Sequence, residues 1–139
     1  MKSVYATVQK EIKIQFYDLD PMDIVWHGNY VRFFEDARSE LLNKIGYNYQ
    51  EMKNSGYAWP VIDLHIRYIK SIKFKHKIII QADLVEYEFR LKILYTIFEK
   101  NNKTRLCKGH TVQVAIDYKT KEMQFVSPKI LAHKLGQKI

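Results

Sequence analysis

The chain has 139 residues, of which 47% are hydrophobic and 14% aromatic, and it carries a formal net charge of +8. This length suits one domain over residues 1–139 with a buried core, and the apolar content excludes an intrinsically disordered chain. The positive charge would attract polyanions, but the lysines are spread over the whole sequence, which is more typical of a solvated surface than of a nucleic-acid-binding patch.

Cys107 is the only cysteine, so no disulfide can form within the chain and an oxidising compartment is not indicated. The first residues lack the continuous apolar run of a signal peptide. No segment approaches the roughly 20 apolar residues that a membrane-spanning helix needs. We therefore expect a cytoplasmic protein without a membrane span.

The first elements follow from the spacing of apolar residues. Residues 11–17 alternate between apolar and polar, which predicts a half-buried strand. Residues 18–28 contain one proline, one glycine and three aspartates, which predicts a loop. From Tyr30 to Ile45 apolar residues recur at spacings of three and four, which predicts a long amphipathic helix with Asn29 as its N-cap and Gly46 just beyond its end.

The rest of the chain predicts mainly strands. After a weaker helical turn at residues 49–52, strand patterns cover residues 62–68, 78–85, 91–98 and 106–118. A short run at 123–126 precedes Pro128 and a terminal helical turn. This order predicts an α+β fold, with an antiparallel sheet of five or six strands wrapped around one central helix. An edge strand of that sheet could pair with a second copy of the chain.

Three aspartates, Asp18, Asp20 and Asp23, stand just ahead of the long helix. They could simply form a turn, because aspartate favours turns and Pro21 fixes its own φ. They could also serve catalysis, since a loop that ends at a helix N-terminus brings free backbone N–H groups close to a carboxylate. In acyl transfer the carboxylate would supply or activate the nucleophile, and the N–H groups would stabilise the oxyanion.

The neighbouring residues allow similar alternatives. Gly28 could let a ligand approach the backbone, or it could merely begin the helix. His27 could form a polar wall of the site and donate its backbone N–H, or it could be an ordinary loop residue. A metal site is disfavoured, because the aspartates lack the glycine and glutamate of a calcium loop and the histidines lack zinc-type spacing. Neither a serine-hydrolase elbow nor a nucleotide-binding glycine motif is present.

The segment FYDLDPMDIVWHGNYVRFFEDAR, residues 16–38, resembles the signature of the hotdog-fold acyl-CoA thioesterases, in the branch of 4-hydroxybenzoyl-CoA thioesterase and the YbgC-like enzymes. The resemblance implies that Asp20 is the catalytic carboxylate, with His27 acting beside it. The helix N-terminus at His27, Gly28 and Asn29 would polarise the thioester carbonyl. The residues expected to shape the substrate site are Tyr30, Phe34, Val61 and Ile62.

The activity implied by this resemblance is hydrolysis of acyl-CoA thioesters, or of acyl groups on an acyl carrier protein, to a free acid and a thiol. No cofactor is implied, because coenzyme A is part of the substrate. The resemblance also implies a homo-oligomer, either a dimer with the site at the subunit interface or a dimer of dimers, which is a homotetramer.

Two departures from the family pattern are visible. Asp23 stands where the family usually has glycine, and its negative charge near Asp20 would disfavour the ionised form of that carboxylate and change the working pH. His76 and Lys77 replace acidic residues that are common at that turn, which adds positive charge suited to a phosphorylated cofactor.

Three other functions stay open at the level of sequence. A hotdog module could bind acyl-CoA or an acyl carrier protein without hydrolysing it, and Asp23 is one feature that favours this alternative. A small basic α+β protein could bind nucleic acid. A hotdog hydratase would carry its acid on the central helix, where Glu35 and Asp36 are available, although the helical spacing turns Asp36 towards solvent.

Overall fold

The computed structural model describes residues 3–137. Its main sheet has five antiparallel strands, hydrogen-bonded in the order β1-β4-β5-β6-β3. These strands are β1 (Ala6–Lys13), β3 (Val61–Tyr68), β4 (Lys77–Glu86), β5 (Leu91–Glu99) and β6 (Arg105–Gln113). A second, two-stranded sheet pairs β2 (Tyr57–Ala58) with β7 (Ile116–Asp117).

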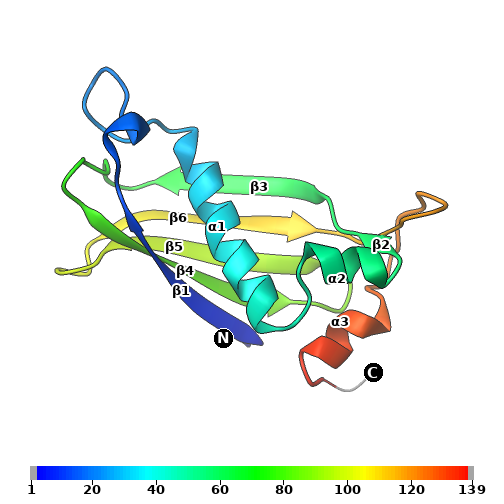
Figure 1. Cartoon of the computed structure of the whole chain (residues 1–139). Coiled ribbons are helices and arrows are strands. Elements are labelled where there is room, and N and C mark those ends of the chain that lie inside the picture. Colours follow the sequence, from blue (N-terminus) through cyan, green and yellow to red (C-terminus); the bar gives the residue numbers. More distant parts are fainter. Residues whose placement is uncertain (1–2, 138–139) are drawn as a thin grey trace.

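One long helix, α1 (Asn29–Lys44), lies across one face of the main sheet (Figure 1). The helices α2 (Tyr49–Asn54) and α3 (Lys129–Lys134) are short, and a 3-10 turn covers Phe16–Asp18. Within residues 3–137 we find no helix long and apolar enough to cross a membrane. The predicted α+β architecture, an antiparallel sheet around one long helix, is confirmed.

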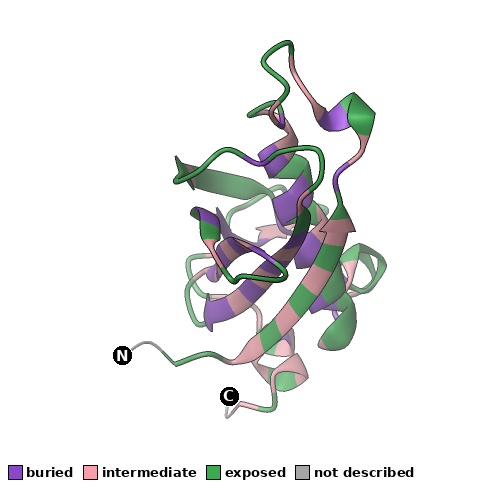
Figure 2. Ribbon diagram, turned by 90° about the vertical axis from the view of Figure 1, so that its left-hand side faces the viewer, coloured by how far each residue is buried: buried purple, intermediate pink, exposed green. Residues whose placement is uncertain are grey.

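The core lies between α1 and the sheet, because each presents an apolar side to the other. β4 and β5 bury nearly every second residue, as the two-residue repeat of a strand dictates, whereas α1 buries residues spaced by three or four. The purple segments of Figure 2 mark these buried residues. Each large apolar side chain buried here contributes roughly 1.5–3 kcal/mol, so the shared core holds α1 firmly on the sheet.

Gly109 in β6 sets how closely α1 approaches the sheet. A Cβ atom at this position would overlap both the Phe34 ring and the carbonyl oxygen of His65 in the neighbouring strand. Without that atom, Phe34 lies directly against the sheet and stacks on Tyr95 with ring centroids 4.3 Å apart. Because Phe34 lies little more than one turn after the start of α1, this contact also positions the helix N-terminus.

The first predicted strand differs from the observed one. It runs from Ala6 to Lys13, and all eight of its residues pair with β4. The alternation continues to residue 17 in the sequence, but the extended pairing does not. The Asp18 carboxylate accepts the Gln15 N–H at 2.8 Å and turns the chain into the 3-10 segment instead.

Two other predictions need correction. Asn29 is the first residue of α1 rather than its N-cap, which is Gly28, because the Asn29 side chain donates to the Asp18 carbonyl oxygen at 2.9 Å instead of capping the helix. The run at 123–126 is no strand and makes only a single bridge, between Met123 and Ile116. The predicted helical turns after residue 48 and after Pro128 are confirmed as α2 and α3.

Candidate active site

Residues 18–26 form a short hairpin loop between β1 and α1. The Asp20 N–H donates to the Ile24 carbonyl oxygen at 2.8 Å, and the Trp26 N–H donates to the Asp18 carbonyl oxygen at 2.9 Å. At the tip, the Asp23 N–H donates to the Asp20 carbonyl oxygen at 3.0 Å and closes a tight turn. The loop is therefore held by its own backbone, and the three aspartates occupy three different environments within it.

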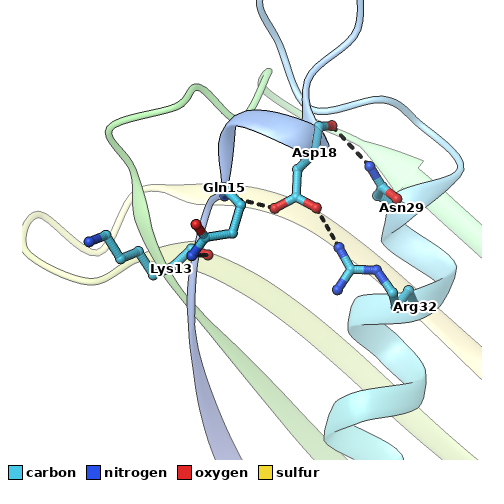
Figure 3. A network of polar contacts seen from close by, with 5 residues as sticks. All are labelled: Lys13, Gln15, Asp18, Asn29 and Arg32. Atoms are coloured by element: carbon cyan, nitrogen blue, oxygen red, sulfur yellow. Dashed lines mark hydrogen bonds and ion pairs between the residues drawn. The ribbon is translucent and has the colours of Figure 1, made fainter.

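Asp18 has a structural role. Its side chain is only 3% exposed, and its Oδ1 accepts a hydrogen bond from Arg32 Nη2 of α1 at 2.6 Å. Its Oδ2 accepts the Gln15 N–H at 2.8 Å, and its carbonyl oxygen accepts from Asn29 Nδ2 at 2.9 Å (Figure 3). Both carboxylate oxygens are thus engaged, and Asp18 ties the loop to the first turns of α1.

Asp20 is placed differently. Its Oδ1 accepts the Met22 N–H at 2.8 Å, and no side chain or backbone donor within residues 3–137 reaches its Oδ2. The carboxylate is partly buried and lines a pocket of about 300 Å³ beside the start of α1. Asp20 therefore takes part in a turn and still has one carboxylate oxygen available for chemistry. Residues that line this pocket with it include Ile24, His27, Tyr30, Tyr68 and Ser71.

The helix N-terminus offers two free donors. The Asn29 N–H donates to the Trp26 carbonyl oxygen at 2.9 Å, and the Tyr30 N–H reaches the His27 carbonyl oxygen at 3.3 Å. The N–H groups of His27 and Gly28 have no acceptor in the described part of the chain. They lie at the positive end of the helix dipole, which favours negative charge. Of the three expected donors, Asn29 is therefore already occupied and His27 and Gly28 are free.

Gly28 is needed for a reason that the sequence did not indicate. A Cβ atom there would overlap the six-membered ring of Trp26, which is about half exposed and packs over the helix start. The expected open approach of a ligand to the Gly28 backbone is thus covered by an indole on this side. Because the overlapping atoms belong to the far end of an exposed side chain, a shift of Trp26 could uncover it.

Tyr68 is a pocket residue that was not among the expected site residues. Its hydroxyl group donates to the His27 carbonyl oxygen at 3.1 Å, and its ring meets Tyr30 edge to face with centroids 4.7 Å apart. Alternation along residues 62–68 places Tyr68 on the same side of β3 as Leu64. That pattern could have located its side chain near α1, but not its hydrogen bond to a residue 41 positions away.

Other titratable groups in this region stay neutral. Burial raises the pKa of Tyr30 to about 12, with smaller contributions from Cys107 and Tyr68. Burial also raises the pKa of Cys107 to about 12. Neither group supplies a base or a thiolate near neutral pH, which leaves Asp20 as the acid–base group of the pocket whose position is fixed by the loop backbone.

The remaining expected substrate residues lie outside this pocket within one chain. Phe34 is fully buried beneath it in the helix–sheet core. Val61 and Ile62 are exposed and lie at the start of β3, whereas Tyr68 is at its end. On α1, Glu35 is exposed and Asp36 is partly buried, and neither lines the pocket.

Two further features bear on the choice of site. Within residues 3–137, no group of three or more histidine, cysteine, aspartate or glutamate side chains could hold a metal ion. A larger hollow of about 410 Å³ lies between the β4–β5 turn and α3, at the end of the sheet away from the aspartate loop (Figure 1). We assign chemistry to the smaller pocket, because it combines a carboxylate with free N–H groups at the start of a long helix.

Known proteins with the same architecture carry related activities. The protein YneP of Bacillus subtilis is 27% identical over 119 residues, which is 84% of this chain and 86% of YneP. The acyl-CoA thioesterase YbgC of Haemophilus influenzae is 26% identical over 107 residues, covering 75% of this chain and 76% of YbgC. The solved structure of the DHNA-CoA thioesterase of Staphylococcus aureus is similar with a TM-score of 0.77 and 29% identity, over 86% of this chain and 80% of that one.

The family match spans nearly the whole fold. Residues 14–133 match the thioesterase-like superfamily, a stretch that begins at the end of β1 and includes the aspartate loop, α1 and all later strands. The expected hotdog fold is confirmed by this match and by the similar solved structure. The chain belongs to the thioesterase-like superfamily.

Proposed function

We propose that the protein is a thioesterase that hydrolyses acyl-CoA thioesters to a free acid and a thiol, with Asp20 as its catalytic carboxylate. The observation that carries this proposal is the pairing of chemistry in one pocket. Asp20 has an oxygen without a protein partner, and His27 and Gly28 have free N–H groups at the start of α1. The relatives named above support the same substrate class.

In this proposal the thioester carbonyl oxygen accepts hydrogen bonds from the N–H groups of His27 and Gly28. These donors and the helix dipole stabilise the negative charge that develops on that oxygen during attack. Fixed donors of this kind act without reorganisation, and loss of one typically lowers kcat by roughly 10²–10³-fold. The role of His27 would lie in its backbone, since its side chain is exposed.

Two routes through Asp20 satisfy this geometry. As a nucleophile, its free oxygen attacks the thioester carbon, the C–S bond breaks, and the thiolate leaves and takes a proton from water. The resulting mixed anhydride is then hydrolysed. As a general base, Asp20 removes a proton from a water molecule that attacks the same carbon. Mass spectrometry of enzyme quenched during turnover separates the routes, because only the first adds the acyl mass to the protein.

The direct test of the activity is thiol release from a panel of acyl-CoA esters, monitored with a thiol reagent. Turnover with at least one aromatic or aliphatic acyl group is the expected result, and it requires no added metal or cofactor. Binding of acyl-CoA without turnover at any pH would instead identify a non-catalytic acyl-CoA or acyl-carrier-protein module. We propose the cytoplasm as its location, in keeping with the single cysteine of the chain.

We further propose a homodimer that forms through β3. This strand is an edge of the main sheet, and seven of its eight residues are exposed (Figure 2). Three of them are the large apolar residues Val61, Ile62 and Leu64. An edge of this kind exposes unpaired backbone groups and favours pairing with another strand. A second copy of β3, antiparallel to the first, would bury both the backbone edge and the apolar side chains.

The charges on β3 favour one register. Directly opposite residues in an antiparallel pair lie on the same face of the sheet, so a symmetric pair can shift only in steps that keep each residue on its face. A register centred on His65 would place Asp63 of each copy opposite Arg67 of the other. It would also bring Ile62 of one copy opposite Tyr68 of its mate. Val61 and Ile62 would then reach the Asp20 pocket of the other subunit.

Charge exchange tests this register. The single variant Asp63→Arg should weaken the dimer, because it places two cations opposite each other on both sides of the symmetry axis. The double variant Asp63→Arg/Arg67→Asp should restore it. Analytical ultracentrifugation measures both. A single variant as dimeric as the parent protein would contradict the register, and association of intact dimers into a homotetramer would appear in the same experiment.

A further inference from the structure

We propose that a polar groove beside the catalytic pocket binds the phosphorylated nucleotide end of coenzyme A, with Lys73 and His76 as its recognition residues. This inference deepens the proposed function and rests on it. It assigns a role to the β3–β4 loop that the hydrolysis mechanism does not use, and it identifies which part of the substrate that loop contacts.

The groove is continuous with the Asp20 pocket. Its volume is about 560 Å³, against about 300 Å³ for the pocket itself. Residues 69–71 line both hollows and form their common wall. A thioester held at Asp20 could therefore extend its pantetheine arm along this wall. The polar lining of the groove comes from Lys70, Ser71, Lys73, His76, Asn102 and Thr104.

The loop that lines the groove is attached to the catalytic loop. The Val25 N–H donates to the Ile72 carbonyl oxygen at 2.8 Å, and Ile24 and Lys73 form an isolated antiparallel bridge. Lys73 therefore lies directly beside the hairpin that positions Asp20. These backbone bonds fix the spacing between the chemical site and the cationic site, which a ligand of defined length requires.

The charge of this loop is strongly positive. Residues 70–77 contain four lysines and His76 but no acidic residue. Lys70 and Lys73 are exposed and have no carboxylate partner in the described part of the chain. Cations without a protein partner at the mouth of a hollow attract anionic groups and form strong charge-assisted hydrogen bonds with phosphate.

The acidic residue in the lining does not cancel this charge for a ligand. Glu99 is only 8% exposed, and its Oε2 accepts the N–H groups of Asn101 at 2.9 Å and Asn102 at 2.8 Å. These two amides compensate the carboxylate within the β5–β6 turn. The groove therefore presents its lysines to solvent, while its carboxylate is turned inward.

His76 adds a directed donor. Its Nδ1 accepts the Lys73 N–H at 3.0 Å, so in the neutral ring the proton lies on Nε2. The same bond holds the backbone of Lys73 in place. A neutral donor beside a flexible ammonium group suits the pyrophosphate or the ribose 3′-phosphate of coenzyme A, which together carry several acceptor oxygens.

The nucleotide of coenzyme A fits this groove better than an acyl carrier protein does. A carrier protein presents one phosphodiester and a broad protein surface, and it would contact a raised or flat area. The cations here line a hollow that adjoins the catalytic pocket, which suits a compact ligand with several phosphates.

The test compares three esters of the same acyl group: acyl-CoA, acyl-dephospho-CoA and acyl-pantetheine. Lys73→Gln should raise the KM for acyl-CoA about three- to tenfold and leave kcat unchanged, since one charge-assisted contact is lost. The KM for acyl-pantetheine should not change. His76→Gln should have a smaller effect of the same kind, and the double variant should exceed either.

Lys119→Gln is the matched control, because it removes the same charge from an exposed turn that belongs to neither hollow. It should leave all three KM values unchanged. An equal rise of KM for acyl-pantetheine in Lys73→Gln would contradict the proposal, as would an unchanged KM for acyl-CoA. Impaired turnover of an acyl carrier protein ester alone would identify a protein-docking site and overturn it as well.

A direct binding measurement separates this inference from the proposed function. Adenosine 3′,5′-bisphosphate, which carries phosphates but no thioester, should bind the parent protein in a calorimeter and bind Lys73→Gln more weakly. If no ester is hydrolysed but this difference is found, the thioesterase proposal fails and the groove stands. If hydrolysis occurs but the nucleotide binds equally to both proteins, the groove assignment fails alone.

Discussion

The hydroxyl group of Tyr68 donates a hydrogen bond to the carbonyl oxygen of His27 across 3.1 Å. That carbonyl belongs to the same peptide unit as the Gly28 N–H, which is one of the two free donors at the start of α1. Because a peptide unit is planar, the bond from Tyr68 restrains the direction of the Gly28 N–H. A residue of the edge strand thus positions a donor of the proposed oxyanion site.

Tyr68→Phe tests this relationship. The variant keeps the ring that packs against Tyr30 but loses the hydroxyl group. We expect kcat to fall about 5- to 20-fold, less than the roughly 10²–10³-fold loss of an entire oxyanion donor, while KM changes little. The measurement is steady-state thiol release. Tyr118→Phe is the control, because the Tyr118 hydroxyl makes no hydrogen bond within residues 3–137.

A fall in kcat that matches a loss of folded protein would assign Tyr68 a purely structural role. Equal unfolding midpoints of the parent protein and Tyr68→Phe, together with the expected loss of kcat, would support the positioning role. An unchanged kcat would show that the Gly28 N–H does not depend on this bond.

Asp18→Asn should act on stability rather than on chemistry. The change removes the charge of a buried carboxylate that pairs with Arg32 at 2.6 Å. Arg32 is 47% exposed, so solvent screens part of this interaction. We expect the free energy of unfolding to fall by about 1–3 kcal/mol, and denaturant unfolding measures it. The folded variant should keep most of its kcat, and a catalytic loss of 10²-fold or more would assign chemistry to the wrong aspartate.

Asp23 adopts a left-handed backbone conformation with φ of 61°. Glycine takes this conformation without strain, which accounts for the glycine usual at this position in the family, and aspartate tolerates it better than most residues. Asp23→Gly should therefore keep or slightly raise stability, whereas Asp23→Val should lower it by about 1–2 kcal/mol. Thermal unfolding compares the two variants. A valine variant as stable as the glycine variant would contradict this interpretation.

The pH–rate profile of Asp23→Gly also tests the expected influence of its charge on Asp20. The two residues share the turn closed by the Asp23 N–H at 3.0 Å. If the Asp23 carboxylate disfavours ionisation of Asp20, the acidic limb of the profile should move to lower pH when that charge is removed. An unmoved limb would show that Asp23, which is exposed, is screened by solvent.

Alkaline pH should destabilise the fold through Cys107. Burial raises the pKa of Cys107 to about 12, whereas a thiol in an unfolded chain ionises near about 8.5. Above that pH the unfolded state loses a proton that the folded state keeps. Its contribution to stability is therefore complete below about pH 8.5 and is lost as the pH rises towards 12, by about 1.4 kcal/mol per pH unit.

Urea unfolding of the parent protein and of Cys107→Ala at pH 8 and pH 10 measures this contribution. Tyr30, whose pKa burial also raises to about 12, adds to the loss only above about pH 10, where an unfolded tyrosine ionises. The parent protein should lose more stability than Cys107→Ala over this interval. Equal losses would contradict the inferred state of the thiol.

The sequence predicted the elements well, because their residue spacing is local information. The periodicities of β4, β5 and α1 match their burial. The roles of the aspartates could not be separated in the same way. Asp18 is structural because Arg32 lies 14 residues further along the chain, and only the fold brings the two together. The resemblance singled out Asp20, but its local composition suited a turn equally well.

The same limit explains the residues that were missed or left unplaced. Tyr68 reaches His27 through the packing of β3 beside α1, across 41 residues of sequence. Gly28 is required by the Trp26 ring rather than by a ligand approaching from that side, and ring positions are not visible in a sequence. Val61 and Ile62 lie away from the pocket of their own chain, so their expected role depends on a second copy and stays a prediction.

The most direct test of the central claim compares Asp20→Asn with Asp18→Asn in thiol release from acyl-CoA at saturating substrate. The two aspartates are neighbours in one loop, but only Asp20 has a free oxygen in the pocket. Asp20→Asn should lower kcat by roughly 10²–10⁴-fold without a matching loss of stability, while Asp18→Asn should do the reverse. Full activity in Asp20→Asn would contradict the account.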